Sequence, residues 1–221
     1  MNAVILACSS LNRHVDAAQA KMNTAFPVIN VDRRYHESPA KMKEQVIKAV
    51  QNLAPEVDTV LVAMGFCGGS WKDIVPKKRI VIPRMDDCIT LLLHSDDTWH
   101  SNLKKTGHFY LTDSDSEFGS LTAMQQSLCD KYGDEDGQDI FQMWFAPYTD
   151  VDVIDTGVYD CHSREYTAEA KKNADLIQGR LNYVNGSNLL LEKLVSGRWD
   201  QQFLVAEPGR MITDRDFISE M

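Results

Sequence analysis

Thr59-Val60-Leu61-Val62-Ala63-Met64 is a short, uninterrupted apolar run, and it leads directly into the turn Gly65-Phe66-Cys67-Gly68-Gly69-Ser70. A run of this kind is typical of a strand that is buried on both faces, and such strands belong to parallel sheets. In open α/β sheets, ligands bind beyond the carboxyl ends of the strands. We therefore predict a buried strand over 59–64 and a turn at the ligand-binding edge over 65–70.

Comparable strands are expected on both sides of this stretch, at 3–7, 26–31 and 79–83. Helices are expected between them, one over 11–25 and one that begins at Ser38-Pro39, an N-cap followed by a first-turn proline. Strands that alternate with helices form right-handed crossovers in almost all proteins. The sequence thus predicts a doubly wound, mainly parallel, Rossmann-like α/β sheet flanked by helices.

The second half of the chain repeats this alternation less clearly. Strands are expected at 108–112, 151–155 and 203–206, with a helix over 164–178. Residues 113–147 are predicted to be mostly helical and to form a lid or an insertion. A chain of 221 residues can bury one sizeable core, so we expect a single α/β domain over 1–221.

The composition excludes several classes of protein. Hydrophobic residues make up 43% and charged residues 25% of the chain, which is typical of a globular protein rather than a disordered or fibrous one. The formal net charge of -9 repels phosphate backbones and anionic lipid headgroups, so we expect no nucleic-acid and no membrane partner. No apolar run approaches the ~20 residues of a membrane-spanning helix, and no basic leader is apparent. We expect a cytoplasmic protein.

The chain has five cysteines, an odd number with irregular spacing. In a reducing compartment this argues against a disulfide framework and favours metal binding, catalysis or plain burial.

A thiol or an imidazole follows each of the first four predicted strands: Cys8, His36, Cys67 and Cys88. Because the carboxyl ends of parallel strands meet at one edge of the sheet, we expect these side chains to lie together. Thiolates and imidazole are the ligands that zinc prefers, and three protein ligands with an open position are typical of catalytic zinc. We predict a zinc site formed by His36, Cys67 and Cys88. Cys8 is a fourth candidate, since a buried free cysteine also packs as a small hydrophobe.

An iron–sulfur cluster would also accept these cysteines. Asp86 and Asp87 could orient an imidazole, or one of them could simply cap the following helix. Cys161 and His162 could complete the metal shell, or begin a helix. The glycines of the turn would let the backbone approach a ligand closely; they are Gly65, Gly68 and Gly69. The turn lacks both nucleotide-binding fingerprints, so nucleotide binding is not predicted from it.

A longer set of motifs carries a family resemblance. It includes Gly65-Phe66-Cys67-Gly68, the segment from Val81 to Leu93 with Pro83-Arg84-Met85-Asp86-Asp87-Cys88 at its centre, Cys8, Tyr35-His36-Glu37-Ser38-Pro39 and Leu194-Val195-Ser196-Gly197-Arg198-Trp199-Asp200. On these residues the chain resembles the uncharacterised family called domain of unknown function 1638. The resemblance adds Arg84 to the residues expected around the metal ligands.

The resemblance also implies a context, because members are often associated with anaerobic one-carbon metabolism near corrinoid proteins and their methyltransferases. It is compatible with a zinc-dependent methyltransferase in which the ion activates a thiol. The alternatives are a non-catalytic accessory that handles a metal or a corrinoid, and an iron–sulfur redox protein. A small molecule or a corrinoid protein is the partner that these readings imply. The chain lacks an Asp-x-His-x-x-Gly motif, so histidine ligation of a corrinoid is not predicted.

Overall fold

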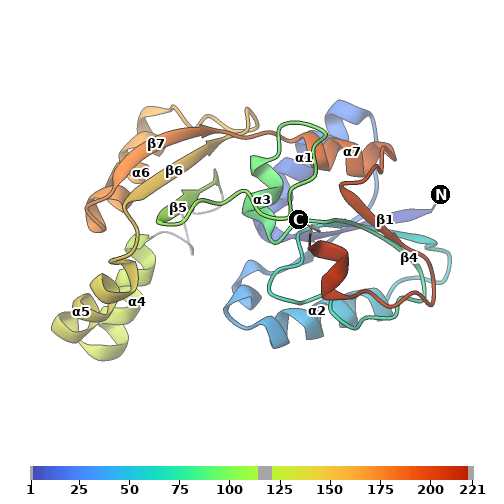
Figure 1. The fold of residues 1–221 in the computed structure, drawn as a ribbon, viewed down its shortest axis with the longest axis horizontal. Coiled ribbons are helices and arrows are strands. Elements are labelled where there is room, and N and C mark those ends of the chain that lie inside the picture. The colour runs from blue at the N-terminus through green and yellow to red at the C-terminus, as the bar shows by residue number, and fades with distance from the viewer. Residues whose placement is uncertain (1, 114–120, 219–221) are drawn as a thin grey trace. The chain divides into compact units, whose positions relative to one another are not determined.

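The computed structural model describes residues 2–113 and 121–218 (Figure 1). The chain divides into two compact units, one formed by Met1–Leu103 with Ser187–Met221 and the other by residues 104–186. The second unit is thus inserted in the sequence of the first. The sequence predicts that residues 1–221 fold as one α/β domain. The division into two compact units does not test whether the units fold together, so this stays a prediction.

The first unit contains a five-stranded sheet with the order β2-β1-β3-β4-β8. Its elements are β1 (Ala3–Cys8), η1 (Ser9–Leu11), α1 (Asn12–Met22), β2 (Val28–Val31), η2 (Arg33–Glu37), α2 (Pro39–Gln51), β3 (Thr59–Ala63), β4 (Arg79–Pro83), α3 (Cys88–Leu93), α7 (Leu189–Ser196), β8 (Phe203–Ala206) and η4 (Asp214–Phe217). Strands β1 to β4 pair in parallel, and β8 pairs antiparallel with β4. The prediction of a mostly parallel, Rossmann-like α/β fold is confirmed.

Strands β1 and β3 are buried along their whole length, because helices cover both faces of this sheet. Figure 1 shows α1 and α7 together on one face and α2 on the other. Helix α2 begins as the sequence predicts, with the Ser38 side chain accepting a hydrogen bond from the backbone of Lys41. Its buried side chains Met42 and Val46 pack in one core with Leu6 of β1 and Val62 of β3. The sheet is therefore held between two apolar helix layers.

The second unit contains a separate three-stranded parallel sheet with the order β5-β6-β7. Its elements are β5 (His108–Leu111), α4 (Leu121–Tyr132), α5 (Asp134–Phe145), β6 (Asp150–Asp155), α6 (Arg164–Leu176) and β7 (Arg180–Asn185). Val151 and Val153 of β6 pack in a core with Phe141 of α5 and Ala170 of α6. The prediction of a mostly helical 113–147 corresponds to α4 and α5, and residues 114–120 lie outside the described residues.

In the ranges that the structure describes, no helix combines the length and the apolar character needed to cross a bilayer.

His14 gives the first unit a pH-dependent stability. Its side chain is buried on α1, and this burial lowers the pKa of His14 to about 4, with the charge of Arg13 adding to the effect. Histidine in an unfolded chain has a pKa of about 6.5, so below that pH the unfolded state binds more protons than the folded state. The free energy of unfolding should therefore fall as the pH falls from 6.5 towards 4.

We expect His14 to account for a loss of about 2 kcal/mol between about pH 7.5 and about pH 5. Urea denaturation of the wild type and of His14→Gln at the two pH values measures this, because the difference between their pH slopes isolates His14. Equal slopes would show that His14 titrates normally in the folded chain.

Candidate metal-binding site

The four residues predicted as metal ligands lie at the carboxyl edge of the first unit's sheet. Cys8 is the last residue of β1, and His36 lies in η2 directly after β2. Cys67 lies in the turn that follows β3, and Cys88 is the first residue of α3, after β4. Parallel pairing of the four strands brings these segments together, as the sequence predicts.

Cys8 is the centre of the contacts at this edge. Its Sγ lies 3.0 Å from Ser10 Oγ and 3.5 Å from His36 Nε2. The Ser10 hydroxyl also lies 3.8 Å from Cys88 Sγ, so it stands between the two thiols as a shared neighbour. Ser10 is the member of this group that the sequence reasoning missed, and the hydroxyl two residues after a candidate ligand was the available signal.

The turn that carries Cys67 is held against the segment that leads into Cys88. The backbone N–H of Phe66 donates to Met85 O at 2.8 Å, and that of Cys67 donates to Asp86 O at 2.8 Å. The approach is so close that a Cβ at position 65 would lie 2.6 Å from the Cα of Asp87, which only glycine avoids.

The rest of the turn uses the left-handed backbone region. Gly68 and Gly69 have φ of +68° and +92°, and Cys67 itself has φ of +48°. A non-glycine residue in this region is uncommon and carries backbone strain, which concentrates at binding and catalytic sites.

The charge of the group concentrates on Cys8. A hydrogen bond from Cys88 lowers the pKa of Cys8 well below its ordinary value, burial opposes this, and His36 adds to the lowering. The same hydrogen bond, together with burial, raises the pKa of Cys88, and burial followed by the charge of Cys8 raises that of Cys67. The environment thus favours negative charge on the pair of Cys8 and Cys88 and disfavours it on Cys67.

The spacing around Cys8 fits a zinc ion in part. Bonds of ~2.0–2.3 Å put neighbouring ligand atoms of tetrahedral zinc about 3.3–3.8 Å apart. The Cys8 Sγ to His36 Nε2 distance of 3.5 Å lies in this range. However, no three of the four predicted ligands, all within the described residues, have ligand atoms mutually within 4.8 Å. Cys8 and Cys67 are buried and His36 is exposed, so His36 has the freedom to close on an ion.

The residues expected around the ligands have contacts of their own. The Asp87 side chain caps α3 by accepting from the Thr90 N–H at 2.8 Å, which agrees with the capping alternative. The guanidinium of Arg84 lies 3.5 Å from the centre of the Trp99 ring and donates to Asp216 O at 2.7 Å. Arg84 therefore fixes the C-terminal segment, and a role of Arg84, Asp86 or Asp87 beside a metal stays a prediction.

Cys161 and His162 lie in the second unit, between β6 and the Ser163 N-cap of α6. Their partner is Asp155, the last residue of β6. Over the described residues, these three form the one set of His, Cys, Asp or Glu side chains whose ligand atoms all lie within 4.8 Å of one another. Sequence reasoning missed Asp155, although its place at the carboxyl end of a predicted strand was a signal.

Comparison with known proteins gives one match. The model of the family described as "Protein of unknown function (DUF1638)" matches residues 30–195. No curated protein and no solved structure matches the chain. The matched range includes the candidate ligands His36, Cys67, Cys88, Cys161 and His162, and the resemblance seen in the sequence is confirmed.

Proposed function

Since the chain belongs to the DUF1638 family, whose description assigns no activity, we propose that it binds a zinc ion at the carboxyl edge of the first unit's sheet. The ligands are Cys8, His36 and Cys88, and Cys67 is a neighbouring thiol, so that the fourth position is left to a substrate. The observation that carries this proposal is the 3.5 Å approach of Cys8 Sγ to His36 Nε2, beside a Ser10 hydroxyl that lies 3.0 Å from Cys8 Sγ and 3.8 Å from Cys88 Sγ. The three candidate ligands follow three different strands of the sheet.

The residue types and their surroundings support zinc over harder cations. Thiolate and imidazole are its preferred ligands, whereas magnesium and calcium require oxygen ligands. The ligands are also fixed to different degrees: Cys8 ends a buried strand and Cys88 begins a helix, while His36 is exposed. A site with an exposed imidazole on one side can admit a substrate to the ion.

The reaction class that we propose is methyl transfer to a thiol. Zinc bound by thiolates stabilises a further thiolate at its open position, where that sulfur is a nucleophile at neutral pH. The new bond joins this sulfur to the methyl carbon, the bond between that carbon and its donor breaks with its electron pair left on the donor, and the thiol proton leaves to solvent. A methylated corrinoid is the donor that the family resemblance suggests.

Metal analysis of the full-length protein, purified without oxygen, tests the proposal. We expect bound zinc, and we expect Cys88→Ser to lose about one equivalent per chain because it removes a thiolate ligand. Cys129→Ser is the matched control, since Cys129 lies on α4 in the other unit and belongs to neither ligand group. Its zinc content should equal that of the wild type.

Other outcomes distinguish the alternatives. Iron with acid-labile sulfide in the wild type, lost in Cys88→Ser, would identify an iron–sulfur protein instead. If Cys88→Ser and Cys8→Ser both bind as much zinc as the wild type, Cys8 and Cys88 are not the ligands. If zinc binds as expected but no methyl transfer from a methylcorrinoid to a thiol is detected, the protein is a metal-binding accessory rather than an enzyme.

A further inference from the structure

A second group of ligand-type side chains lies at the corresponding edge of the other sheet. Strands β5, β6 and β7 are all parallel, so their carboxyl ends share one edge, which is where ligands bind in such sheets. Asp155 ends β6, and Cys161 and His162 immediately precede α6. The group therefore occupies a strand-to-helix crossover, in the same topological position as the thiols of the first unit.

The three side chains converge closely. Asp155 Oδ2 lies 3.2 Å from His162 Nε2, and the buried Cys161 thiol approaches both groups. One ligand atom from each residue lies within 4.8 Å of the other two. The backbone N–H of Gly157 donates to Asp155 Oδ1 at 3.1 Å, which orients the carboxylate so that Oδ2 faces the imidazole.

The surroundings hold these side chains in place and leave one side open. Cys161 is buried in the core of the second unit, while the side chain of His162 is 61% exposed. The imidazole stacks on the ring of Tyr183 from β7, with 4.5 Å between ring centres. The Tyr183 hydroxyl is in turn 3.0 Å from Thr167 Oγ1 on α6. The group thus has a fixed thiol at its base and a braced imidazole beside solvent.

We propose that Asp155, Cys161 and His162 form a second metal site, which binds zinc through one oxygen, one sulfur and one nitrogen atom. Bonds of ~2.0–2.2 Å to oxygen and nitrogen require these two atoms to be about 3.3 Å apart in a tetrahedral site, and they are already 3.2 Å apart. Three protein ligands leave the fourth position to water or to a small ligand.

This site is independent of the first one. All three ligands belong to residues 104–186, so the site requires no side chain from the first unit. An ordinary hydrogen-bonded Asp–His pair would account for two of the three residues. Such a pair does not explain why the thiol of the buried Cys161 lies beside the same two side chains. A metal test can detect whether Cys161 is a ligand.

The test is titration of the full-length protein with Co²⁺ without oxygen, because cobalt replaces zinc and gives a charge-transfer absorption when a thiolate binds it. In Cys88→Ser, which disables the first site, we expect one Co²⁺ per chain with this absorption. Adding His162→Gln should weaken the remaining binding by at least ~10-fold, as expected when a metal site loses a well-placed group. Asp155→Asn, which can keep the hydrogen bond from Gly157, should weaken it similarly. Adding Cys129→Ser instead should change nothing.

The outcomes separate the two sites. Unchanged Co²⁺ binding after His162→Gln or Asp155→Asn in the Cys88→Ser background would overturn the second site. Binding of cobalt without the thiolate absorption would also overturn it, because Cys161 would then not be a ligand. If Cys88→Ser binds as much cobalt as the wild type and His162→Gln binds none, the first site does not exist and the second is supported. Because His162 is exposed, its replacement tests the site without disturbing the core.

Discussion

Replacement of Gly65 by alanine is expected to lower the free energy of unfolding by about 3 kcal/mol, at the upper end of the costs of overpacking. A Cβ at this position would lie 2.6–2.8 Å from three backbone atoms of Asp87. Backbone atoms cannot rotate away as a side chain can, so the turn and the segment before α3 must separate. That movement would weaken the two hydrogen bonds that join Phe66 and Cys67 to Met85 and Asp86.

The same variant should lose zinc, because the movement displaces Asp87 and with it the ligand Cys88 that follows. Urea denaturation and metal analysis of Gly65→Ala measure the two effects. Gly137→Ala is the matched control: its Cβ would lie 2.5 Å from the Cα of Cys129, an equally severe clash in the second unit. It should destabilise the protein but leave the zinc of the first site bound. Equal zinc retention in both variants would show that the turn does not position the ligands.

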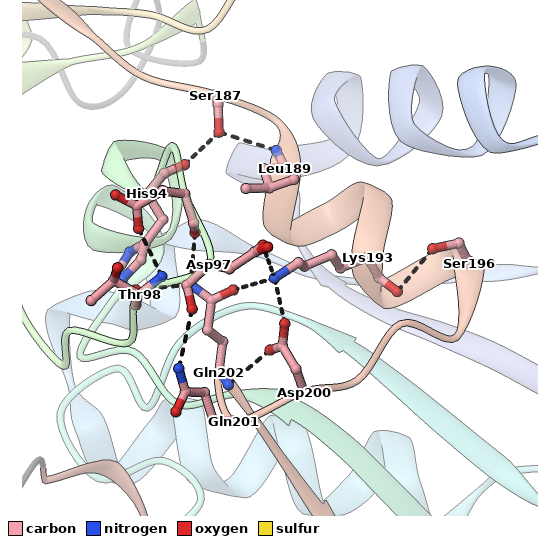
Figure 2. Close-up of polar contacts among 11 residues, drawn as sticks. His94, Asp97, Thr98, Ser187, Leu189, Lys193, Ser196, Asp200, Gln201 and Gln202 are labelled. Atoms are coloured by element: carbon pink, nitrogen blue, oxygen red, sulfur yellow. Dashed lines mark hydrogen bonds and ion pairs between the residues drawn. The ribbon is translucent and has the colours of Figure 1, made fainter.

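Lys193→Met is the second variant with a large expected effect. The Lys193 side chain is 1% exposed, and its Nζ lies 2.5 Å from carboxylate oxygens of Asp97 and Asp200 and 2.6 Å from Gln202 Oε1 (Figure 2). Burial by itself would lower the pKa of Lys193, but the two carboxylates outweigh burial and raise it. Gln202 extends the network by donating to Asp96 O and Thr98 O. One ammonium group therefore connects α7, the 96–98 loop and the turn before β8.

We expect Lys193→Met to lower the free energy of unfolding by about 2–3 kcal/mol. A wholly buried pair would lose ~3–5 kcal/mol, but Asp97 and Asp200 are partly exposed and can be hydrated again, so the effect is smaller. Chemical denaturation measures the loss, and it should shrink when Asp200→Asn is already present, since the two residues share one network.

Lys171→Met, which removes an exposed ion pair with Asp175, is the control and should cost no more than about 0.5 kcal/mol. If Lys193→Met costs no more than this control, the buried ammonium contributes nothing net to stability.

The sequence predicts the first unit well because its strands are buried. β1, β3 and β4 are uninterrupted apolar runs, and no other element accommodates such short runs between turns. β7 was missed, because Arg180-Leu181-Asn182-Tyr183-Val184-Asn185 is a half-exposed edge strand in which polar side chains alternate with apolar ones. Two of these polar residues, Arg180 and Asn182, bond to the buried carboxylate of Asp150, a contact that no local pattern reveals.

Which strands pair with one another could also not be predicted from the sequence. The runs at 108–112 and 151–155 were expected as strands, but the sequence did not show that they pair with each other, and β6 with β7, in a sheet of their own. The same distinction holds for the sites. Cys8, His36, Cys67 and Cys88 were predicted at one edge because each follows a parallel strand. Asp155 was missed because a carboxylate after a strand is usually only a hydrated surface group.

The insertion of one unit within the other has a consequence for synthesis on the ribosome. Residues 104–186 form all contacts of the second unit from one continuous stretch, so that unit can fold as soon as the stretch has emerged. The first unit must wait, because α1 packs against α7 and the outer edge of β4 is covered by β8. Until the C-terminal segment has emerged, its nascent half is therefore expected to expose an apolar helix face and an open strand edge.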